Sequence, residues 1–320
     1  MVRLGKLAKL TRKEAEKVAE LYDLGDIISY KYVQGGLINY NFDFKTDKGS
    51  FMVRRLGYKL AGYWKRQKAF EYSIVSYLHK KKLPFMIPDF MRNRNGKYIS
   101  AVGKSLFEVY PKIPGEKIST YNDKQLKEVA KAAAIYHKAI KGHKGKIKDD
   151  DFEWILRKYA QIRRLKPNNK LNRLALENVD FFESLLKHLL GMDLRKDLVI
   201  GHRDMHRNNL LFDGNRLVGI LDFENLGGVS KMNDLTFILE EEKPSSWGMF
   251  IKEYKRHGSL LKGEDKKLIL FILIHKCNIF WWQVLGMRKT PELKYKRLRY
   301  TVNFTKRMLR KAKMEKSWKF

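Results

Sequence analysis

The stretch GHRDMHRNNLLFDGNRLVGILDFEN, residues 201–225, gathers side chains that can handle protons or metal ions. Asp204 and Asn209 lie five residues apart, and Asp222 lies thirteen residues beyond Asn209. Two carboxylates and an amide oxygen are hard oxygen ligands of the kind that Mg²⁺ prefers. One of the carboxylates can instead take a proton from an incoming hydroxyl. The stretch therefore indicates a metal site joined to an acid–base group.

The order of these residues indicates phosphoryl transfer. That reaction needs one Asp that orients and deprotonates the acceptor, and an Asn and a second Asp that hold metal on the phosphates. His202-Arg203-Asp204…Asn209 has the spacing H-R-D-x-x-x-x-N of a kinase catalytic loop, and Asp222 begins an Asp-Phe pair where kinases carry Asp-Phe-Gly. Polar residues that merely cap turns would not fall in this order.

Parts that contact a nucleotide are expected upstream. Gly35 and Gly36, followed by Asn39, lie between two strand-like segments, and glycines there let backbone amides approach phosphates. A glycine pair between strands is also an ordinary turn. In the strand FMVRR, Arg54 can point at the nucleotide where kinases use a lysine. Glu71, on the next helix, is the acid expected to pair with Arg54.

The alternation of residues 28–56 predicts three antiparallel strands, with a turn at Asp47-Lys48-Gly49. Residues 62–80 have helical spacing and should form one helix that crosses the small sheet. Two more strands are expected up to about residue 110. Prolines and glycines then place a hinge at about residues 108–116.

The predicted fold is therefore α+β and bilobal, like that of protein kinases. Residues 1–110 form a small N-terminal nucleotide-binding lobe with an antiparallel sheet and one crossing helix. Residues 111–320 form a larger, mostly helical C-terminal lobe for catalysis and substrate binding, in which residues 210–221 make a short hairpin.

The composition favours a folded, cytoplasmic protein. The chain has 320 residues, 44% of them apolar, and its single cysteine, Cys277, cannot form an intramolecular disulfide. The N-terminus is too charged for a signal peptide. The most apolar segment, residues 268–286, approaches bilayer length but contains His275 and Lys276. We therefore expect a buried helix and no transmembrane segment.

The net charge is unusual, because 67 Lys and Arg stand against 35 Asp and Glu and give +32. Residues 288–320 hold 13 basic and two acidic side chains, and residues 52–70 hold six basic and none acidic. Such fields attract nucleic acid, anionic membranes or polyanionic substrates. A lysine-rich solvated surface without a specific partner is the other interpretation.

The chain resembles the aminoglycoside phosphotransferase, choline kinase and homoserine kinase superfamily, whose fold is similar to that of protein kinases. The resemblance spans about residues 10–240 and rests on GGLIN, FMVRR, YPKIPGE, IYHKAI, HRDMHRNNLLF and ILDFEN. The second histidine of His202-x-Asp204-x-His206-x-x-Asn209 separates this group from typical protein kinases. The homoserine-kinase-like branch is the most similar, through NNLLFDGNRLVGILDFE.

The resemblance implies an ATP- and Mg²⁺-dependent kinase with a small-molecule hydroxyl substrate. It assigns Asp204 as the catalytic base and Asn209 and Asp222 as ligands of Mg²⁺. It also implies that Arg54 and Glu71 form the ion pair that binds phosphate. The remaining residues that it implies to bind the nucleotide, through backbone contacts to adenine, are Glu108, Val109 and Tyr110.

The resemblance further implies that Asp234 is a buried acid that braces the catalytic loop. His202 and His206 are also expected to organise the loop, because no thiolate or third histidine is near enough to complete a metal site.

Three functions follow from these observations. The first is a kinase that phosphorylates a hydroxyl of a small metabolite, which is an amino acid, an amino alcohol or a sugar. A neutral or anionic metabolite, such as an amino acid or a sugar, fits the charge best. Aminoglycosides and choline are cations, and a strongly basic protein does not suit them. The second is a kinase or binding protein that acts on RNA or another polyanion through its basic surface. The third, a kinase-like scaffold without catalysis, is disfavoured by the retention of Asp204, Asn209 and Asp222.

Overall fold

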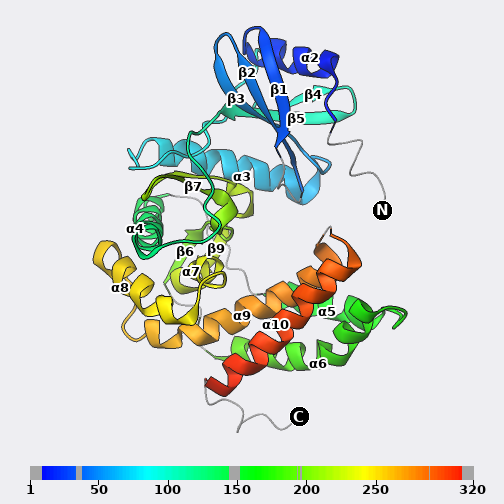
Figure 1. Ribbon diagram of the computed structural model, residues 1–320, viewed down its shortest axis with the longest axis vertical. Coiled ribbons are helices and arrows are strands. Elements are labelled where there is room, and N and C mark those ends of the chain that lie inside the picture. The colour runs from blue at the N-terminus through cyan, green and yellow to red at the C-terminus, as the bar shows by residue number, and fades with distance from the viewer. Residues whose placement is uncertain are drawn as a thin grey trace. The chain divides into compact units, whose positions relative to one another are not determined.

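The computed structural model describes residues 9–33, 38–143, 152–192, 194, 197–287 and 289–311. The chain folds as two compact units (Figure 1). The first unit consists of Met1–His143 with His206–Leu226, and the second consists of Lys144–Met205 with Gly227–Phe320. Helices and antiparallel strands are both present, which confirms the α+β class. The lobe boundary at residues 110/111 stays a prediction.

The first unit contains a five-stranded antiparallel sheet with the strand order β1-β2-β3-β5-β4. Its strands are β1 (Ile27–Val33), β2 (Tyr40–Thr46), β3 (Gly49–Arg55), β4 (Ser100–Val102) and β5 (Ser105–Pro111). Thr46 lies opposite Gly49, so the turn between β2 and β3 falls where the sequence predicts it. The three consecutive strands and the two later ones are thereby confirmed.

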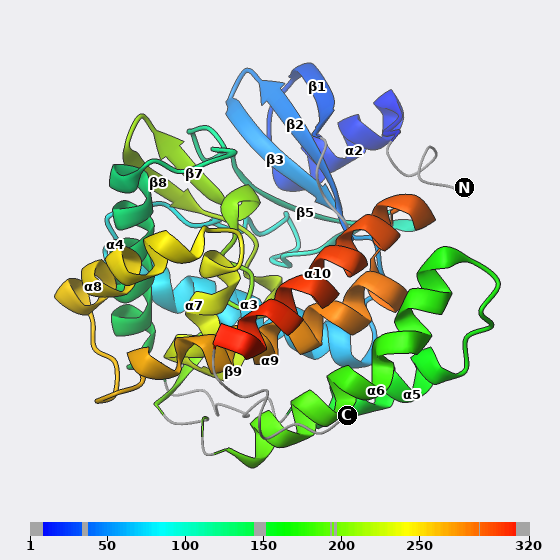
Figure 2. The ribbon, with the colours of Figure 1, turned by 60° about the horizontal axis from the view of Figure 1, so that its bottom comes forward.

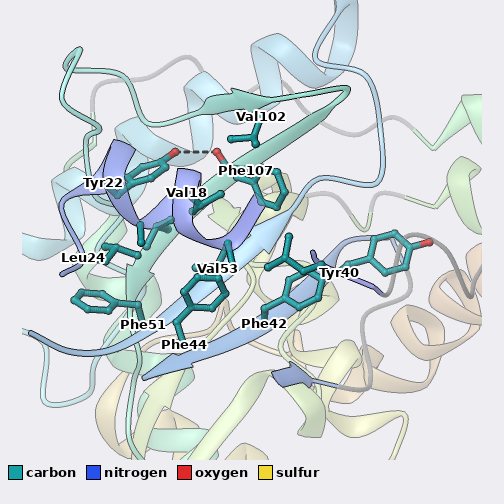
Figure 3. Close-up of a cluster of buried hydrophobic side chains, with 14 residues drawn as sticks. Val18, Tyr22, Leu24, Tyr40, Phe42, Phe44, Phe51, Val53, Val102 and Phe107 are labelled. Carbon is teal, nitrogen blue, oxygen red and sulfur yellow. Dashed lines mark hydrogen bonds between the residues drawn. The ribbon is translucent and has the colours of Figure 1, made fainter. Parts of the chain in front are cut away.

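One face of this sheet packs against α2 (Arg12–Tyr22) and forms a hydrophobic core (Figure 3). Alternate residues of β2, β3 and β5 supply its aromatic and aliphatic side chains, because successive side chains of a strand point to opposite faces. The hydroxyl oxygen of Tyr22 lies 2.8 Å from the carbonyl oxygens of both Tyr98 and Phe107, which can accept its one proton. The Thr11 side chain caps the helix in a capping box. This core fixes α2 to the sheet.

The opposite face carries polar residues in one row. Asn41 of β2 lies opposite Arg54 of β3, and Arg54 lies opposite Glu108 of β5. Helix α3 (Gly62–His79) contributes Lys68 and Tyr72, whose side chains contact Glu108 on this face. Helix α3 is the crossing helix that the sequence predicts. Polar groups thus gather where α3 meets the sheet.

The rest of the first unit holds α4 (Asp123–Ile140) and the hairpin of β7 (Leu210–Asp213) and β8 (Arg216–Ile220). The hairpin is flanked by the 3₁₀ turns η1 (Arg207–Asn209) and η2 (Phe223–Asn225). The hairpin confirms the one that the sequence predicts.

The second unit is mainly helical, as predicted for this part of the chain. Figure 2 shows α5 (Glu153–Arg163), α6 (Lys170–Gly191), α9 (Leu268–Trp281) and α10 (Pro291–Lys311), which pack together. Strands β6 (Leu198–Gly201) and β9 (Gly227–Ser230) pair antiparallel. Its remaining elements are α7 (Lys231–Leu239), η3 (Pro244–Ser246), α8 (Trp247–His257), η4 (Asp265–Lys267) and η5 (Trp282–Gly286).

Helix α9 lies in the segment Asp265–Gly286, which is long and apolar enough to cross a membrane, with a mean hydropathy of 1.6 in its most apolar window. Of that window, 61% is buried inside the protein. His275 and Lys276 each place a side-chain nitrogen 2.8 Å from Glu240. Burial opposes ionisation of Glu240, but the contacts with His275 and Lys276 lower its pKa well below the usual range. The polar residues of this apolar run thus contact Glu240 within the second unit, which favours a core helix.

Gly57 allows a close approach of two backbone segments, and this predicts a stability effect. A Cβ atom at Gly57 would overlap the carbonyl oxygen of Ile38, whereas one at Gly248, in α8, meets nothing within 4 Å. Gly57→Ala should therefore lower the free energy of unfolding by about 1–3 kcal/mol. Gly248→Ala should leave it unchanged or raise it by up to about 1 kcal/mol. Denaturant titrations measure both values, and equal stability of Gly57→Ala and wild type would contradict the close approach.

Candidate functional site

The β7–β8 hairpin is fixed to the rest of the first unit on both of its edges. Met86 exchanges backbone hydrogen bonds of 2.8 and 2.9 Å with β8. Glu116 exchanges two with Phe212 of β7, also at 2.8 and 2.9 Å. Because both edges are held, the open end of the hairpin, which carries Asn209 and Asp222, has a fixed position in the unit.

The hairpin places the two predicted magnesium ligands side by side. The backbone N–H of Leu221 donates to the carbonyl oxygen of Asn209 at 2.7 Å, so Asp222 follows directly on the residue paired with Asn209. Asp222 has a left-handed backbone, with φ of 65°, and turns the chain from β8 into η2. Its side chain keeps 28% of its surface exposed. The structure thus brings together two residues that the sequence separates.

The His206 side chain contacts two of the three residues of η1, Asn208 and Asn209. Its Nδ1 accepts a hydrogen bond from the backbone N–H of Asn208 at 3.2 Å, and its Nε2 lies 3.4 Å from Nδ2 of Asn209. Among the residues that the structure describes, no group of three or more His, Cys, Asp or Glu is placed to hold a metal ion. The contacts agree with the expected role of His206 in organising the loop.

Arg54 is the buried cation of the site, and its side chain is 4% exposed. Its Nη1 lies 3.4 Å from Oδ1 of Asp222 and 3.5 Å from Oε1 of Glu108, and its Nε donates to Oδ1 of Asn41 at 3.2 Å. Burial acts to lower the pKa of Arg54, but Asp222, Tyr110 and Glu108 raise it well above the usual value. The guanidinium is therefore held ionised beside Asp222.

Glu71 pairs with Lys68, whereas the sequence predicts Arg54 as its partner. The Nζ of Lys68 lies 2.7 Å from Glu71 and 2.8 Å from Glu108, and all three side chains are at most 2% exposed. Sequence reasoning missed Lys68, although a lysine three residues before Glu71 lies on the same side of the helix. The shared role of Arg54 and Glu71 in binding phosphate stays a prediction.

The two glutamates of this cluster differ in their pKa. Burial raises the pKa of Glu71 to about 7, against the opposing effect of Lys68. Burial also acts to raise the pKa of Glu108, but Lys68 and Arg54 outweigh it and lower that pKa below the usual value. Glu108 is thus the more acidic of the two carboxyl groups.

Strand β5 carries the three residues that are predicted to contact adenine, Glu108, Val109 and Tyr110. Glu108 directs its side chain into the ionic cluster, and the Tyr110 ring lies 5.8 Å from the guanidinium of Arg54. The carbonyl oxygen of Val109 accepts a hydrogen bond from the backbone N–H of Met91 at 2.8 Å. Backbone contacts of these three residues to adenine stay a prediction.

Gly35 and Gly36 lie outside the described residues. Asn39, the third residue of that motif, uses both ends of its side-chain amide within the unit. Its Oδ1 accepts from the backbone N–H of Gly57 at 3.1 Å, and its Nδ2 donates to Oε2 of Glu224 at 2.8 Å. These bonds fix the chain after the glycines, and a contact of Asn39 with a nucleotide stays a prediction.

Glu224 is a second residue that sequence reasoning missed. It is 4% exposed, and burial together with the charge of Asp222 raises its pKa to about 8. Its backbone carbonyl and that of Leu226 accept hydrogen bonds from the Gln67 side chain of α3, at 2.8 and 2.9 Å. Through these hydrogen bonds Glu224 anchors the turn that carries Asp222. The sequence signal that could have pointed to Glu224 is its position two residues after Asp222.

Asp204 lies in the second unit, in the loop after β6, and its side chain is partly exposed. The buried carboxylate of Asp234 accepts hydrogen bonds from the backbone N–H groups of His202 at 3.0 Å and Arg203 at 2.6 Å. The brace that the sequence predicts for this loop is therefore present. The role of Asp204 as the catalytic base stays a prediction.

Comparison with known proteins identifies the family. The sequence profile of the phosphotransferase enzyme family matches residues 29–263. The chain belongs to the phosphotransferase enzyme family. Among curated relatives of this phosphotransferase, homoserine kinase of Pseudomonas aeruginosa is 23% identical over 236 residues, which cover 72% of the chain and 70% of the relative. Homoserine kinase of Parvibaculum lavamentivorans is 23% identical over 220 residues, covering 66% and 63%.

Solved structures confirm a kinase-like fold for this phosphotransferase. A microcompartment-associated aminopropanol kinase matches with a TM-score of 0.72 at 13% identity and covers 94% of the chain and 98% of that structure. Spectinomycin phosphotransferase, solved with ADP and spectinomycin, matches with a TM-score of 0.63 at 17% identity, covering 91% and 94%. Choline kinase of Cryptosporidium parvum Iowa II matches with a TM-score of 0.60 at 17% identity, covering 89% and 90%. The predicted family resemblance and fold are thereby confirmed.

The buried acid Glu224 predicts a pH-dependent change in stability. Folding raises the pKa of Glu224 from a usual value of 4.5 to about 8. The folded protein therefore holds this proton more tightly than the unfolded chain, and the free energy of unfolding falls as the pH rises from about 4.5 through about 8. Gln cannot ionise and retains an oxygen that can accept from Asn39. Relative to wild type, Glu224→Gln should therefore gain at least about 1 kcal/mol between about pH 5 and about pH 9. Denaturant titrations at both pH values measure this gain, and a difference that is independent of pH would contradict it.

Proposed function

We propose that this phosphotransferase depends on ATP and Mg²⁺ and transfers the γ-phosphate to a hydroxyl of a small metabolite. The observation that carries the proposal is the meeting of Arg54 and Asp222 in the first unit, with Asn209 next to Asp222 across the hairpin. This supports the proposal, because phosphoryl transfer requires a cation that binds phosphate close to oxygen ligands that hold the metal.

The donor set at the end of the hairpin fits magnesium. Asn209 offers an amide oxygen and Asp222 a partly exposed carboxylate, and Mg²⁺ is commonly bound by one or two such side chains together with water and phosphate oxygens. When bound, the metal supplies charge neutralisation on the phosphates. Arg54 would add a charge-assisted hydrogen bond to a phosphate oxygen.

Asp204 is the base in this proposal. The carboxylate of Asp204 takes the proton from the substrate hydroxyl while the oxygen of that hydroxyl bonds to the γ-phosphorus. The bond from that phosphorus to the β–γ bridging oxygen breaks, and ADP leaves with the electron pair. The two hydrogen bonds to Asp234 hold the backbone immediately before Asp204 and so limit its movement.

The proposed acceptor is an amino acid, an amino alcohol or a sugar. The curated relatives are homoserine kinases, and a protein of similar fold is an aminopropanol kinase. Homoserine is an amino acid with a hydroxyl group, and aminopropanol is an amino alcohol. The net charge of +32 disfavours large cationic acceptors such as aminoglycosides. RNA or another polyanion as the target of the basic surface stays a prediction from the charge.

Asp204→Asn tests the base directly. The variant should lose about 10²- to 10⁴-fold in kcat, because Asn cannot accept the proton, while its affinity for ATP stays within about twofold of wild type. The measurement is ATP turnover against a panel of hydroxyl metabolites, with ATP binding determined by calorimetry.

Asp213→Asn is the matched control, because Asp213 is an exposed residue in the turn of the β7–β8 hairpin whose ion pair with Arg216 is also exposed. It should have wild-type kinetics. Wild-type turnover in Asp204→Asn would exclude Asp204 as the base. A wild-type protein that neither binds ATP nor phosphorylates any acceptor would refute the proposed function.

A further inference from the structure

We infer that Glu108, on β5, is the positioning residue that holds Arg54 for the phosphates of the nucleotide, and that Lys68 and Tyr72 of α3 fix Glu108 in turn. This inference rests on the proposed function. It replaces Glu71, the acid that the sequence predicts for this task, by a carboxylate on the sheet.

The strand register places Glu108 beside Arg54. The two residues are direct cross-strand partners on β3 and β5, and Asn41 flanks Arg54 on the other side in β2. Directly opposite residues have Cβ atoms only about 4.5–5.5 Å apart. The sheet itself therefore sets the position of Glu108 relative to Arg54, independently of where α3 lies.

Both carboxylate oxygens of Glu108 are engaged. Oε1 contacts Nζ of Lys68 at 2.8 Å and Nη1 of Arg54 at 3.5 Å. Oε2 accepts a hydrogen bond from the hydroxyl of Tyr72 at 2.6 Å. The Glu108 side chain is fully buried. A carboxylate held through both oxygens cannot rotate away from the arginine without breaking a buried hydrogen bond.

Glu71 is less suited to the task. Its ion pair is with Lys68 at 2.7 Å, and burial brings its pKa to about 7, so that it is partly protonated near neutral pH. Glu108 lies between two cations, which lower its pKa. A carboxylate that must hold a guanidinium at neutral pH has to remain ionised, and Glu108 meets that condition.

The role of Glu108 becomes larger once metal and nucleotide bind. Arg54 has two carboxylate contacts, Asp222 and Glu108. Asp222 is also a proposed metal ligand, so its carboxylate would then be shared between Arg54 and the metal ion. Glu108, which is not a proposed metal ligand, would retain its contact with Arg54 and keep the guanidinium in place when the contact with Asp222 changes.

Two pairs of variants test this inference. Glu108→Gln should raise the KM for ATP by about tenfold or more, whereas Glu71→Gln should raise it by a smaller factor. Tyr72→Phe leaves the carboxylate intact but removes its hydrogen bond, and should raise the KM for ATP by about threefold or more. Tyr22→Phe is the matched control, because it also removes a buried tyrosine hydroxyl, one that contacts the carbonyls of Tyr98 and Phe107.

The readouts separate positioning from structural damage. The KM for ATP, the KM for the acceptor and kcat are measured for each variant, together with thermal unfolding. Damage to the fold lowers the active fraction and kcat without a selective change in the KM for ATP. Loss of positioning raises the KM for ATP and leaves the KM for the acceptor near that of wild type. If Glu108→Gln does not fold, Tyr72→Phe against Tyr22→Phe carries the test.

Three results would overturn the inference. The first is a wild-type KM for ATP in Glu108→Gln or, where that variant does not fold, in Tyr72→Phe. The second is a larger rise of the KM for ATP in Glu71→Gln than in Glu108→Gln. The third is an equal rise of that KM in Tyr72→Phe and Tyr22→Phe. A wild-type protein that binds no ATP would overturn the proposed function and this inference together. That failure is distinguishable, because it appears before any substitution is made.

Discussion

The burial of Arg54 is the constraint on which the first unit depends. A guanidinium that is 4% exposed has lost its water, and an unpaired buried charge costs several kcal/mol. The strand register supplies Asn41 and Glu108 as its neighbours, and the hairpin brings Asp222 to its other side. Lys68 forms a further ion pair with Glu108. The elements around Arg54 are therefore positioned by the need to neutralise it.

The same constraint accounts for the turn that follows Asp222. Asp222 must be anchored close to Arg54 and yet keep its carboxylate partly exposed for other partners. Glu224 supplies the anchor through Asn39 and through the contact of its backbone with Gln67. Because the pKa of Glu224 is raised to about 8, it is mostly protonated at neutral pH and adds little negative charge beside Asp222. Because Glu224 is mostly neutral, it can be buried beside Asp222 without a second cation to balance its charge.

The sequence predicts the elements well and the contacts of buried charges less well. The alternation of side chains predicts β1 to β3, and the spacing of Asp204, Asn209 and Asp222 predicts a site for phosphoryl transfer. Both are local patterns in the sequence. The partner of Arg54 depends instead on which residue of β5 lies opposite it, and that register is not local. For the same reason a basic residue such as Lys68 reads as a solvated surface lysine until the packing of α3 is known.

The central claim is that buried Arg54 binds the phosphates of a nucleotide. The most direct measurement is the calorimetric titration of ATP and of adenosine into the wild type and into Arg54→Ala, with Mg²⁺ present. The account predicts that the affinity for ATP falls about tenfold or more in the variant, while the affinity for adenosine, which has no phosphates, is retained. An affinity for ATP equal to that of the wild type in Arg54→Ala would contradict it.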